Sequence, residues 1–187
     1  KPSWTTPVKM AYKDYDVWEL PPNGQGIVVS AALDILNNLT PPTADPVEKL
    51  HMQIEALKAS LTDGKKTIAD PTYMKISTDD FLSEESRLNR QRRISATAHL
   101  PDCADVSDGG TVYACTADKD GNSVSLIQSN YDGFGSGIVI PGTGIALNNR
   151  GRNFSADPTS PNAVGPRKKS YHTIIPSFLS KDGIPIG

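Results

Sequence analysis

The spacing of apolar residues predicts helices in the first half of the chain. Residues 27–39 are apolar on almost every side, as is typical of a buried helix. After Asp45, a good N-cap residue followed by proline, apolar residues recur every three or four positions, which predicts a second helix that ends before Gly64. The apolar positions on this helix face are Val47, Leu50, Ile54, Leu57 and Leu61. A third helix is expected over about 79–94, with acids early and arginines late, as suits the helix dipole.

The second half of the chain has the pattern of strands and turns. Residues 95–110 are small and polar and are interpreted as a mobile connector. Residues 111–117 and 124–129, separated by an Asp-Gly turn, predict a β-hairpin. Residues 173–179 are also strand-like, and the first twenty residues end in a short strand that enters a turn. Helices first and antiparallel strands second indicate the α+β fold class.

Composition narrows the possible function classes. The 187 residues carry 19 Lys and Arg against 21 Asp and Glu, a formal net charge of -2 that disfavours a general nucleic-acid or anionic-membrane binder. The arginines of the third helix are accordingly interpreted as a solvated helix end. No apolar run approaches the ~18 residues that a membrane-spanning helix needs. A soluble protein without nucleic-acid or membrane partners is therefore expected.

The cysteines and histidines signal neither a metal site nor a disulfide framework. Cys103 and Cys115 lack the CxxC spacing, and the three histidines are far apart along the chain. Two isolated, buried thiols are expected, with a single disulfide bridge as the alternative. No metal or organic cofactor is implied. Reduced cysteines favour the cytoplasm slightly over a secreted or periplasmic location, and the compartment stays open.

The boundary with the most chemical content is Asp108-Gly-Gly-Thr111, where the connector ends and the hairpin begins. Cleavage of the Gly110–Thr111 bond would place the threonine hydroxyl beside its own α-amine, whose pKa of about 8 suits a base that activates the hydroxyl. Glycine at 110 tolerates the strained backbone that attack on the preceding carbonyl requires. The alternative is an ordinary junction between a linker and a strand, so these residues alone leave both interpretations open.

Several blocks of the chain resemble the γ-glutamyltransferase family. They are Leu20-Pro-Pro-Asn-Gly-Gln-Gly26, Asp118-Lys-Asp-Gly-Asn122, Phe134-Gly-Ser-Gly137, Gly144-Ile-Ala-Leu-Asn-Asn149, Asn153-Phe-Ser155, Asn162-Ala-Val-Gly-Pro166 and Lys181-Asp-Gly183. The resemblance implies part of an αββα sandwich of the N-terminal-nucleophile hydrolases, made as a precursor that cuts itself between Gly110 and Thr111. It further implies that residues 1–110 are the end of the large subunit and residues 111–187 the start of the small, catalytic subunit, with Thr111 as nucleophile.

The same resemblance assigns candidate residues around the nucleophile. Ser129 stands where the family has a threonine that hydrogen-bonds the nucleophile, so a hydroxyl is kept. Tyr131 replaces an asparagine, and Asn153 replaces the aspartate, that together hold a substrate α-amine. A carboxylate opposite an ammonium is a charge-assisted contact, and neutral Asn153 removes that attraction.

The carboxylate side of the implied site also departs from the family. His172 and Thr173 align with paired serines that hold a substrate α-carboxylate. Arg150 and Arg152 make the site friendlier to an anion, or alternatively are two solvated loop arginines. These substitutions resemble the cephalosporin-acylase-like branch, whose acyl groups need not carry an α-amine.

The activity implied by the resemblance is that of an acyl-transferring amidohydrolase. Thr111 would attack a γ-glutamyl or related side-chain amide, and the acyl-enzyme would pass to water or an acceptor amine. The alternatives are a cephalosporin (glutaryl) acylase and a non-catalytic relative or inactive fragment. The family's oxyanion hole uses a Gly-Gly pair beyond the Lys-Asp-Gly block that this chain lacks, so the chain alone is expected to be nearly inactive. The implied partners are a small amide substrate and the remainder of the precursor, paired as large and small subunits.

Overall fold

The computed structural model describes residues 3–40, 44–100 and 109–187 of the chain. The first elements are β1 (Val8–Tyr12), β2 (Tyr15–Glu19), α1 (Gly26–Asn37), α2 (Pro46–Thr67), the 3₁₀ turn η1 (Pro71–Tyr73), α3 (Thr78–Phe81) and α4 (Glu84–Gln91). The later elements are β3 (Gly109–Ala117), β4 (Ser123–Asp132), the 3₁₀ turn η2 (Arg150–Asn153), β5 (Phe178–Lys181) and β6 (Ile184–Pro185). This mixture of helices and antiparallel strands confirms the predicted fold class.

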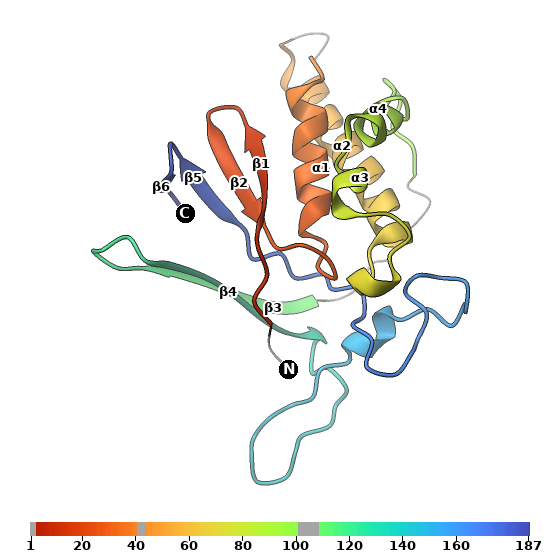
Figure 1. Cartoon of the computed structure of the whole chain (residues 1–187), viewed down its shortest axis with the longest axis vertical. Helices are drawn as coiled ribbons and strands as arrows, with labels where there is room; N and C mark the ends of the chain where they lie inside the picture. The colour runs from red at the N-terminus through yellow and green to blue at the C-terminus, as the bar shows by residue number, and fades with distance from the viewer. Residues whose placement is uncertain (1–2, 41–43, 101–108) are drawn as a thin grey trace.

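The strands form two antiparallel sheets (Figure 1). In the sheet of order β1-β2-β5-β6, strands from the two ends of the chain are neighbours, and Val17 of β2 pairs with Leu179 of β5. The sequence pattern indicates only the second strand of the β1–β2 hairpin, because the aromatic and proline residues of this segment obscure the alternation. The strand predicted over 173–179 begins only at Phe178, after an irregular segment.

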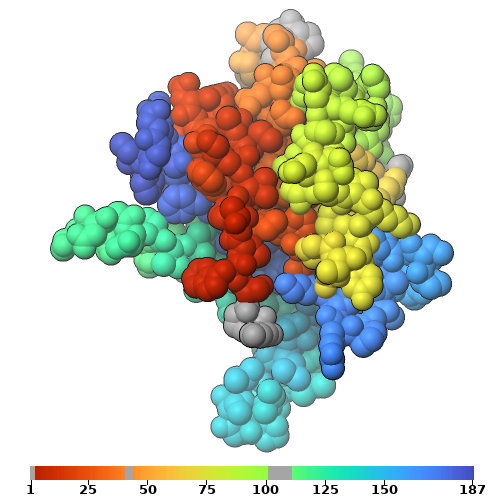
Figure 2. Space-filling view, in the orientation of Figure 1, coloured from red at the N-terminus to blue at the C-terminus, as the bar shows by residue number. Residues whose placement is uncertain are grey.

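The other sheet is the predicted β3–β4 hairpin, which is confirmed. Asp118 organises its tip by accepting hydrogen bonds from the backbone N–H groups of Asp120 and Asn122. The hairpin and the loop that follows it project from the body of the molecule (Figure 2). Apolar residues of the hairpin such as Val112 and Leu126 are exposed. A two-stranded sheet is marginal in water, so this hairpin needs further polypeptide on its faces.

The core lies where α1 packs on α2, α3 and the first hairpin. The helix predicted over 27–39 is confirmed as a buried one, and Ile27 and Ile35 are completely buried. Asp45 caps α2 as predicted, accepting from the N–H of Val47. The predicted end of α2 at Gly64 is wrong, because the helix continues to Thr67. Gly64 is a contact point: a Cβ there would lie 2.5 Å from Cγ2 of Val28.

The apolar stripe predicted on α2 is mostly exposed, and of its five residues Leu61 packs against the core cluster that includes α1. Val47 is 72% exposed and Leu57 is 42% exposed. The buried face instead carries the small residues Ala56, Ser60 and Gly64, spaced four apart, which let the two helices approach closely. The face of α2 that packs on α1 is therefore determined by small side chains that allow close approach of the two backbones, and the spacing of apolar residues does not predict it.

The single helix predicted over 79–94 is wrong, because two helices occupy this segment. Ser77 starts α3 with a capping box to Asp80, and Ser83 starts α4 by accepting from the N–H of Ser86. The expected solvated helix end is also wrong for Arg90. Its side chain is buried, with Nε 2.9 Å from a carboxylate oxygen of Asp63 and Cζ 4.1 Å from the Phe81 ring centroid.

Two sequence expectations concern the cysteines and the connector. Cys115 carries a free thiol that is exposed, so the prediction of a buried thiol is wrong there. Cys103 and half of the predicted connector, residues 101–108, lie outside the described residues. Among the residues that the structure describes, no helix is long and apolar enough to cross a membrane.

Glu19, at the end of β2, is a buried carboxyl group against the start of α1. It is 1% exposed, and neither of its oxygens has a hydrogen-bond partner among the described residues. Oε2 lies only 2.6 Å from the place where a Cβ on Gly26 would stand. Burial raises the pKa of Glu19 to about 7, because the charged form loses its hydration.

Gly64→Ala should destabilise the folded state by about 1 to 3 kcal/mol despite the better helix propensity of alanine, because the new methyl group overlaps Val28. Gly165→Ala is the control and should change little, because the nearest atom to its new methyl group would be Cδ of Lys168 at 3.7 Å. Urea titration measures both. Equal stability of the two variants would contradict the packing described for α1 and α2.

Glu19→Gln should stabilise the protein increasingly between about pH 4.5 and 7 and by a constant amount above pH 7. The unfolded chain ionises Glu19 in that window while the folded protein keeps it neutral, so wild-type stability falls there as pH rises. Unfolding measured from pH 4 to 8 tests this. Glu85→Gln, at an exposed carboxylate of α4, is the control and should follow the wild-type curve. A pH-independent effect of Glu19→Gln would contradict the argument.

Candidate active site

Thr111 and Ser129 face each other across the β3–β4 ladder. They are register partners, and Thr111 Oγ1 donates a 3.0 Å hydrogen bond to Ser129 Oγ. Ser129 Oγ also accepts from the N–H of Tyr131 at 2.9 Å, which a hydroxyl oxygen with two lone pairs can do. The ladder register shifts between Gly109 and Thr111, so the regular pairing is interrupted at Gly110. The predicted nucleophile therefore has its predicted hydroxyl partner beside an irregular point of the strand.

Tyr131 connects this pair of hydroxyls to the next layer of the site. Its backbone is left-handed, with φ of 78°, and its hydroxyl donates to Asn153 Oδ1 at 2.7 Å. Asn153 Nδ2 donates to the carbonyl of Tyr171 at 2.9 Å, which fixes the orientation of the amide. Asn162 Nδ2 donates to the carbonyl of Asn153, so the 3₁₀ turn η2 is tied to the loop after it. Asn153 is thus part of the wall of the site, with both ends of its amide engaged.

Arg150 is a buried cation in contact with Tyr131 and Thr173. It is 7% exposed, its Cζ lies 4.9 Å from the Tyr131 ring centroid, and Nη1 donates to Thr173 Oγ1 at 2.9 Å. No carboxylate among the described residues forms an ion pair with it. Burial lowers the pKa of Arg150, and interaction with Tyr131 partly opposes this. The interpretation of Arg150 as a solvated loop residue is therefore excluded.

Arg152, two residues on, is in a different environment. Its side chain is largely exposed, and Nη1 lies 2.8 Å from Asp132 Oδ2. Asn149 Nδ2 donates to the same oxygen of Asp132. These contacts, first from Asn149 and then from Arg152, hold the pKa of Asp132 below its usual range.

The segment around His172 is locked against the loop before α1. The N–H of His172 donates to the carbonyl of Asn23, and the N–H of Gln25 donates to the carbonyl of His172, both at 2.9 Å. The Gln25 side chain donates to the carbonyl of Thr173 and accepts from the hydroxyl of Tyr171. Gln25 therefore holds the residues on both sides of His172.

His172 itself does not join the cavity beside Tyr131. Its side chain lines a neighbouring cavity with Pro21, Asn23 and Lys169. Burial, assisted by Arg150, lowers the pKa of His172 to about 4, so the ring is neutral at pH 7. Its predicted role in substrate binding stays a prediction.

The cavity beside Tyr131 has a volume of about 260 Å³ and a mostly polar wall. It is lined by Lys65, Tyr131, Arg152, Asn153, Asn162, Tyr171 and Thr173. The structure thus brings Tyr131, Asn153 and Thr173 together, as the family resemblance implied. Sequence reasoning did not assign Gln25, Lys65, Asn162 or Tyr171, although Gln25 and Asn162 lie in blocks that carried the resemblance.

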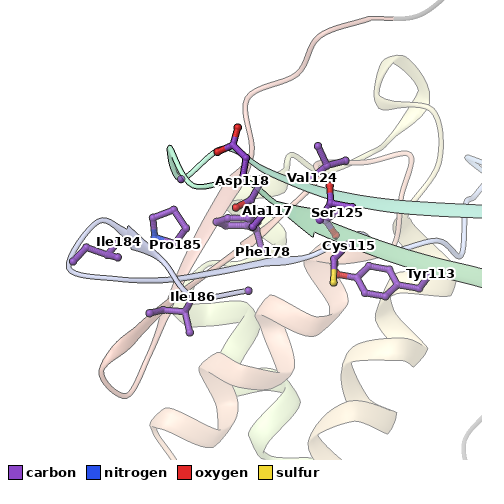
Figure 3. A pocket seen from close by; sticks show the side chains of 14 residues that line it. Tyr113, Cys115, Ala117, Asp118, Val124, Ser125, Phe178, Ile184, Pro185 and Ile186 are labelled. Atoms are coloured by element: carbon purple, nitrogen blue, oxygen red, sulfur yellow. Dashed lines mark hydrogen bonds between the residues drawn. The ribbon is translucent and has the colours of Figure 1, made fainter.

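A larger cavity, about 450 Å³, lies elsewhere, between the β3–β4 hairpin and β5–β6 (Figure 3). Its wall is mainly apolar, with Phe178, Ile184 and Ile186 facing Tyr113 and Cys115. Neither Thr111 nor a histidine lines it. Within 3–40, 44–100 and 109–187, no group of three or more His, Cys, Asp or Glu side chains could hold a metal ion.

Gln25→Ala should lower stability by about 1 to 3 kcal/mol, because it removes both hydrogen bonds that hold Tyr171 and Thr173. Gln53→Ala, at an exposed position of α2, is the matched control and should be close to neutral. Chemical denaturation provides the measurement. If Gln25→Ala were as stable as the control, the two hydrogen bonds of Gln25 would contribute nothing to the free energy of unfolding.

Comparison with known proteins gives consistent matches. The family model described as Gamma-glutamyltranspeptidase matches residues 1–187. The chain is 36% identical over 184 residues to the glutathione hydrolase-like YwrD proenzyme of Bacillus subtilis, covering 97% of this chain and 35% of that protein. It is 33% identical over 171 residues to the oxamate amidohydrolase proenzyme of Klebsiella pneumoniae, covering 91% and 32%. The chain thus spans about a third of the length of these relatives.

Among solved structures, the chain is similar to the cephalosporin acylase from Bacillus halodurans. The TM-score is 0.89 at 48% identity, and the match covers 100% of this chain and 34% of that one. This similarity confirms the predicted N-terminal-nucleophile hydrolase fold.

Proposed function

Because the chain belongs to the gamma-glutamyltranspeptidase family, we propose that it forms the middle of a self-cleaving precursor whose nucleophile is Thr111. The observation that carries the proposal is the hydrogen bond from Thr111 to Ser129 at the strand irregularity after Gly110. It keeps the threonine hydroxyl next to an acceptor oxygen, and the irregularity of the strand lies at the residue before it.

Cleavage divides the chain into residues 1–110, from the large subunit, and residues 111–187, from the small one. In the first step Thr111 Oγ1 attacks the carbonyl carbon of Gly110, and the C–N bond breaks to leave an ester and a free α-amine. Water then hydrolyses the ester, releasing Gly110 as a carboxylate and Thr111 as the new N-terminus. The pairing of β2 with β5 would keep the two pieces associated afterwards.

In the mature enzyme the α-amine of Thr111 accepts the hydroxyl proton as Oγ1 attacks the substrate amide. The proton passes to the departing amine, and an acyl ester remains on Thr111. Water or an acceptor amine then attacks this ester, which releases the acid or a new amide and restores the hydroxyl. The remainder of the precursor supplies further groups, including those that stabilise the oxyanion.

The second candidate function is an acylase whose acyl group carries no α-amine. Asn153 favours it, because a neutral amide with both ends engaged offers no negative charge to an ammonium group. The similarity to a cephalosporin acylase and to an oxamate amidohydrolase supports the same class of activity.

The full-length precursor should yield a fragment that begins Thr-Val-Tyr-Ala. Thr111→Ala should abolish cleavage, and Ser129→Ala should slow it by about 10-fold or more, because the hydroxyl loses its partner. Intact mass and N-terminal sequencing are the measurements. Thr116→Ala, on the same strand, is the control and should cleave normally. A wild-type precursor that never produces this fragment would overturn the proposal.

A further inference from the structure

Tyr131 lies near the end of β4 and has a backbone conformation that tyrosine rarely adopts. Its φ of 78° is in the left-handed region, where a Cβ crowds the neighbouring carbonyl oxygen. Glycine takes this conformation freely, whereas any residue with a Cβ takes it at a cost. A tyrosine therefore keeps it only where the surrounding structure holds it there.

The peptide plane between Asn130 and Tyr131 shows what this conformation achieves. The N–H of Tyr131 donates to Ser129 Oγ at 2.9 Å, and the carbonyl of Asn130 accepts from the N–H of Asn149 at 3.2 Å. The φ angle of Tyr131 is a rotation of the rest of the residue against this plane. The left-handed value lets the N–H face Ser129 while the side chain reaches the 3₁₀ turn η2.

Two residues of η2 hold the Tyr131 side chain. The Arg150 guanidinium lies against the ring, with Cζ 4.9 Å from the centroid, which is within the range of a cation–π contact. Asn153 Oδ1 accepts from the Tyr131 hydroxyl at 2.7 Å. Arg150 in turn donates to Thr173 Oγ1, and Asn153 donates to the carbonyl of Tyr171. The ring is thus held at its face and at its hydroxyl by groups that have anchors of their own.

The Ser129 hydroxyl links these contacts to the candidate nucleophile. Its oxygen accepts from the Tyr131 N–H and from Thr111 Oγ1, so both of its lone pairs are occupied. The Tyr131 N–H holds Ser129 Oγ, and Ser129 Oγ holds the Thr111 hydroxyl. A shift of the peptide plane before Tyr131 would therefore misplace the nucleophile, and the rate of attack depends steeply on that geometry.

We propose that Tyr131 is a positioning residue for attack by Thr111, and that its side chain acts by holding the left-handed backbone that directs its N–H to Ser129. Arg150 acts one step further out, through the Tyr131 ring. The proposal rests on the proposed function, because it concerns the geometry of the nucleophile assigned there. It gives Tyr131 a part in self-cleavage, apart from the substrate contact that the family resemblance implies.

Two variants of Tyr131 separate the backbone from the side chain when cleavage of the full-length precursor is timed in cell-free translation. Tyr131→Ala should slow cleavage about 10-fold, because alanine disfavours the left-handed region and has no ring to be held there. Tyr131→Gly removes still more of the side chain but adopts this φ freely, so it should cleave about 5-fold faster than Tyr131→Ala. If the ring only filled space, the glycine variant would be the slower one. A glycine variant no faster than the alanine variant, or an alanine variant as fast as wild type, would refute the proposal.

Lys13 provides the matched control, because its φ of 55° in the turn between β1 and β2 is also left-handed. Lys13→Ala and Lys13→Gly should differ from each other in stability, measured by urea titration, and both should cleave at the wild-type rate. If the cleavage rate follows stability at Lys13 as it does at Tyr131, the effect at Tyr131 is one of folding and the proposal fails.

A double-mutant cycle tests the part assigned to Arg150. Arg150→Gln should slow cleavage about 3-fold or more in the wild-type background and cause no further loss in Tyr131→Gly, which has no ring to hold. Arg92→Gln, at the exposed C-cap of α4, is its control and should cleave normally. An equal loss in both backgrounds would show that Arg150 does not act through Tyr131.

The wild-type precursor distinguishes failure of this inference from failure of the proposed function. If wild type is cleaved before Thr111 and the Tyr131 variants are cleaved equally fast, only the inference is wrong. If wild type is never cleaved there, the proposed function is wrong and the inference falls with it.

Discussion

The candidate site depends on the backbone pairing between the loop before α1 and the segment around His172. Two backbone hydrogen bonds join His172 to Asn23 and Gln25. The side chains of Asn23 and Gln25 add hydrogen bonds to the carbonyls of Ser170 and Thr173. Because these groups are remote in sequence, each bond links the start of the described chain to its end. This pairing fixes the segment that carries Tyr171 and Thr173 against the loop before α1.

Two arginines of this fold are buried, but only one of them has a carboxylate partner among the described residues. Arg90 is neutralised by Asp63 and packs on Phe81, so it joins α2, α3 and α4 into one unit. Arg150 is buried to a similar degree without a carboxylate partner among the described residues. The first arrangement is what a stable core requires. The second leaves a buried charge beside a polar cavity, at an electrostatic cost.

Local sequence patterns predicted the elements whose causes are local. The N-cap Asp45, the buried helix α1 and the hairpin turn at Asp120-Gly121 all follow from a few adjacent residues. The two errors in the helices have different causes. Gly64 was interpreted as a helix end, but it is a packing contact with Val28, which is remote in sequence. The helix expected over 79–94 divides at Ser83, because the Ser83 side chain caps a new helix there although the charge pattern continues.

By itself, the sequence determined the family resemblance, the candidate nucleophile Thr111 and its supporting hydroxyl Ser129, because these depend on residue identity along the chain. It also identified Arg150 and Asn153 as departures from the family pattern. Only the tertiary structure decided that Arg150 is buried and Arg152 exposed, and that His172 faces a different cavity from Thr173. The environment of a charged group is set by side chains remote in sequence, and folding alone brings those together.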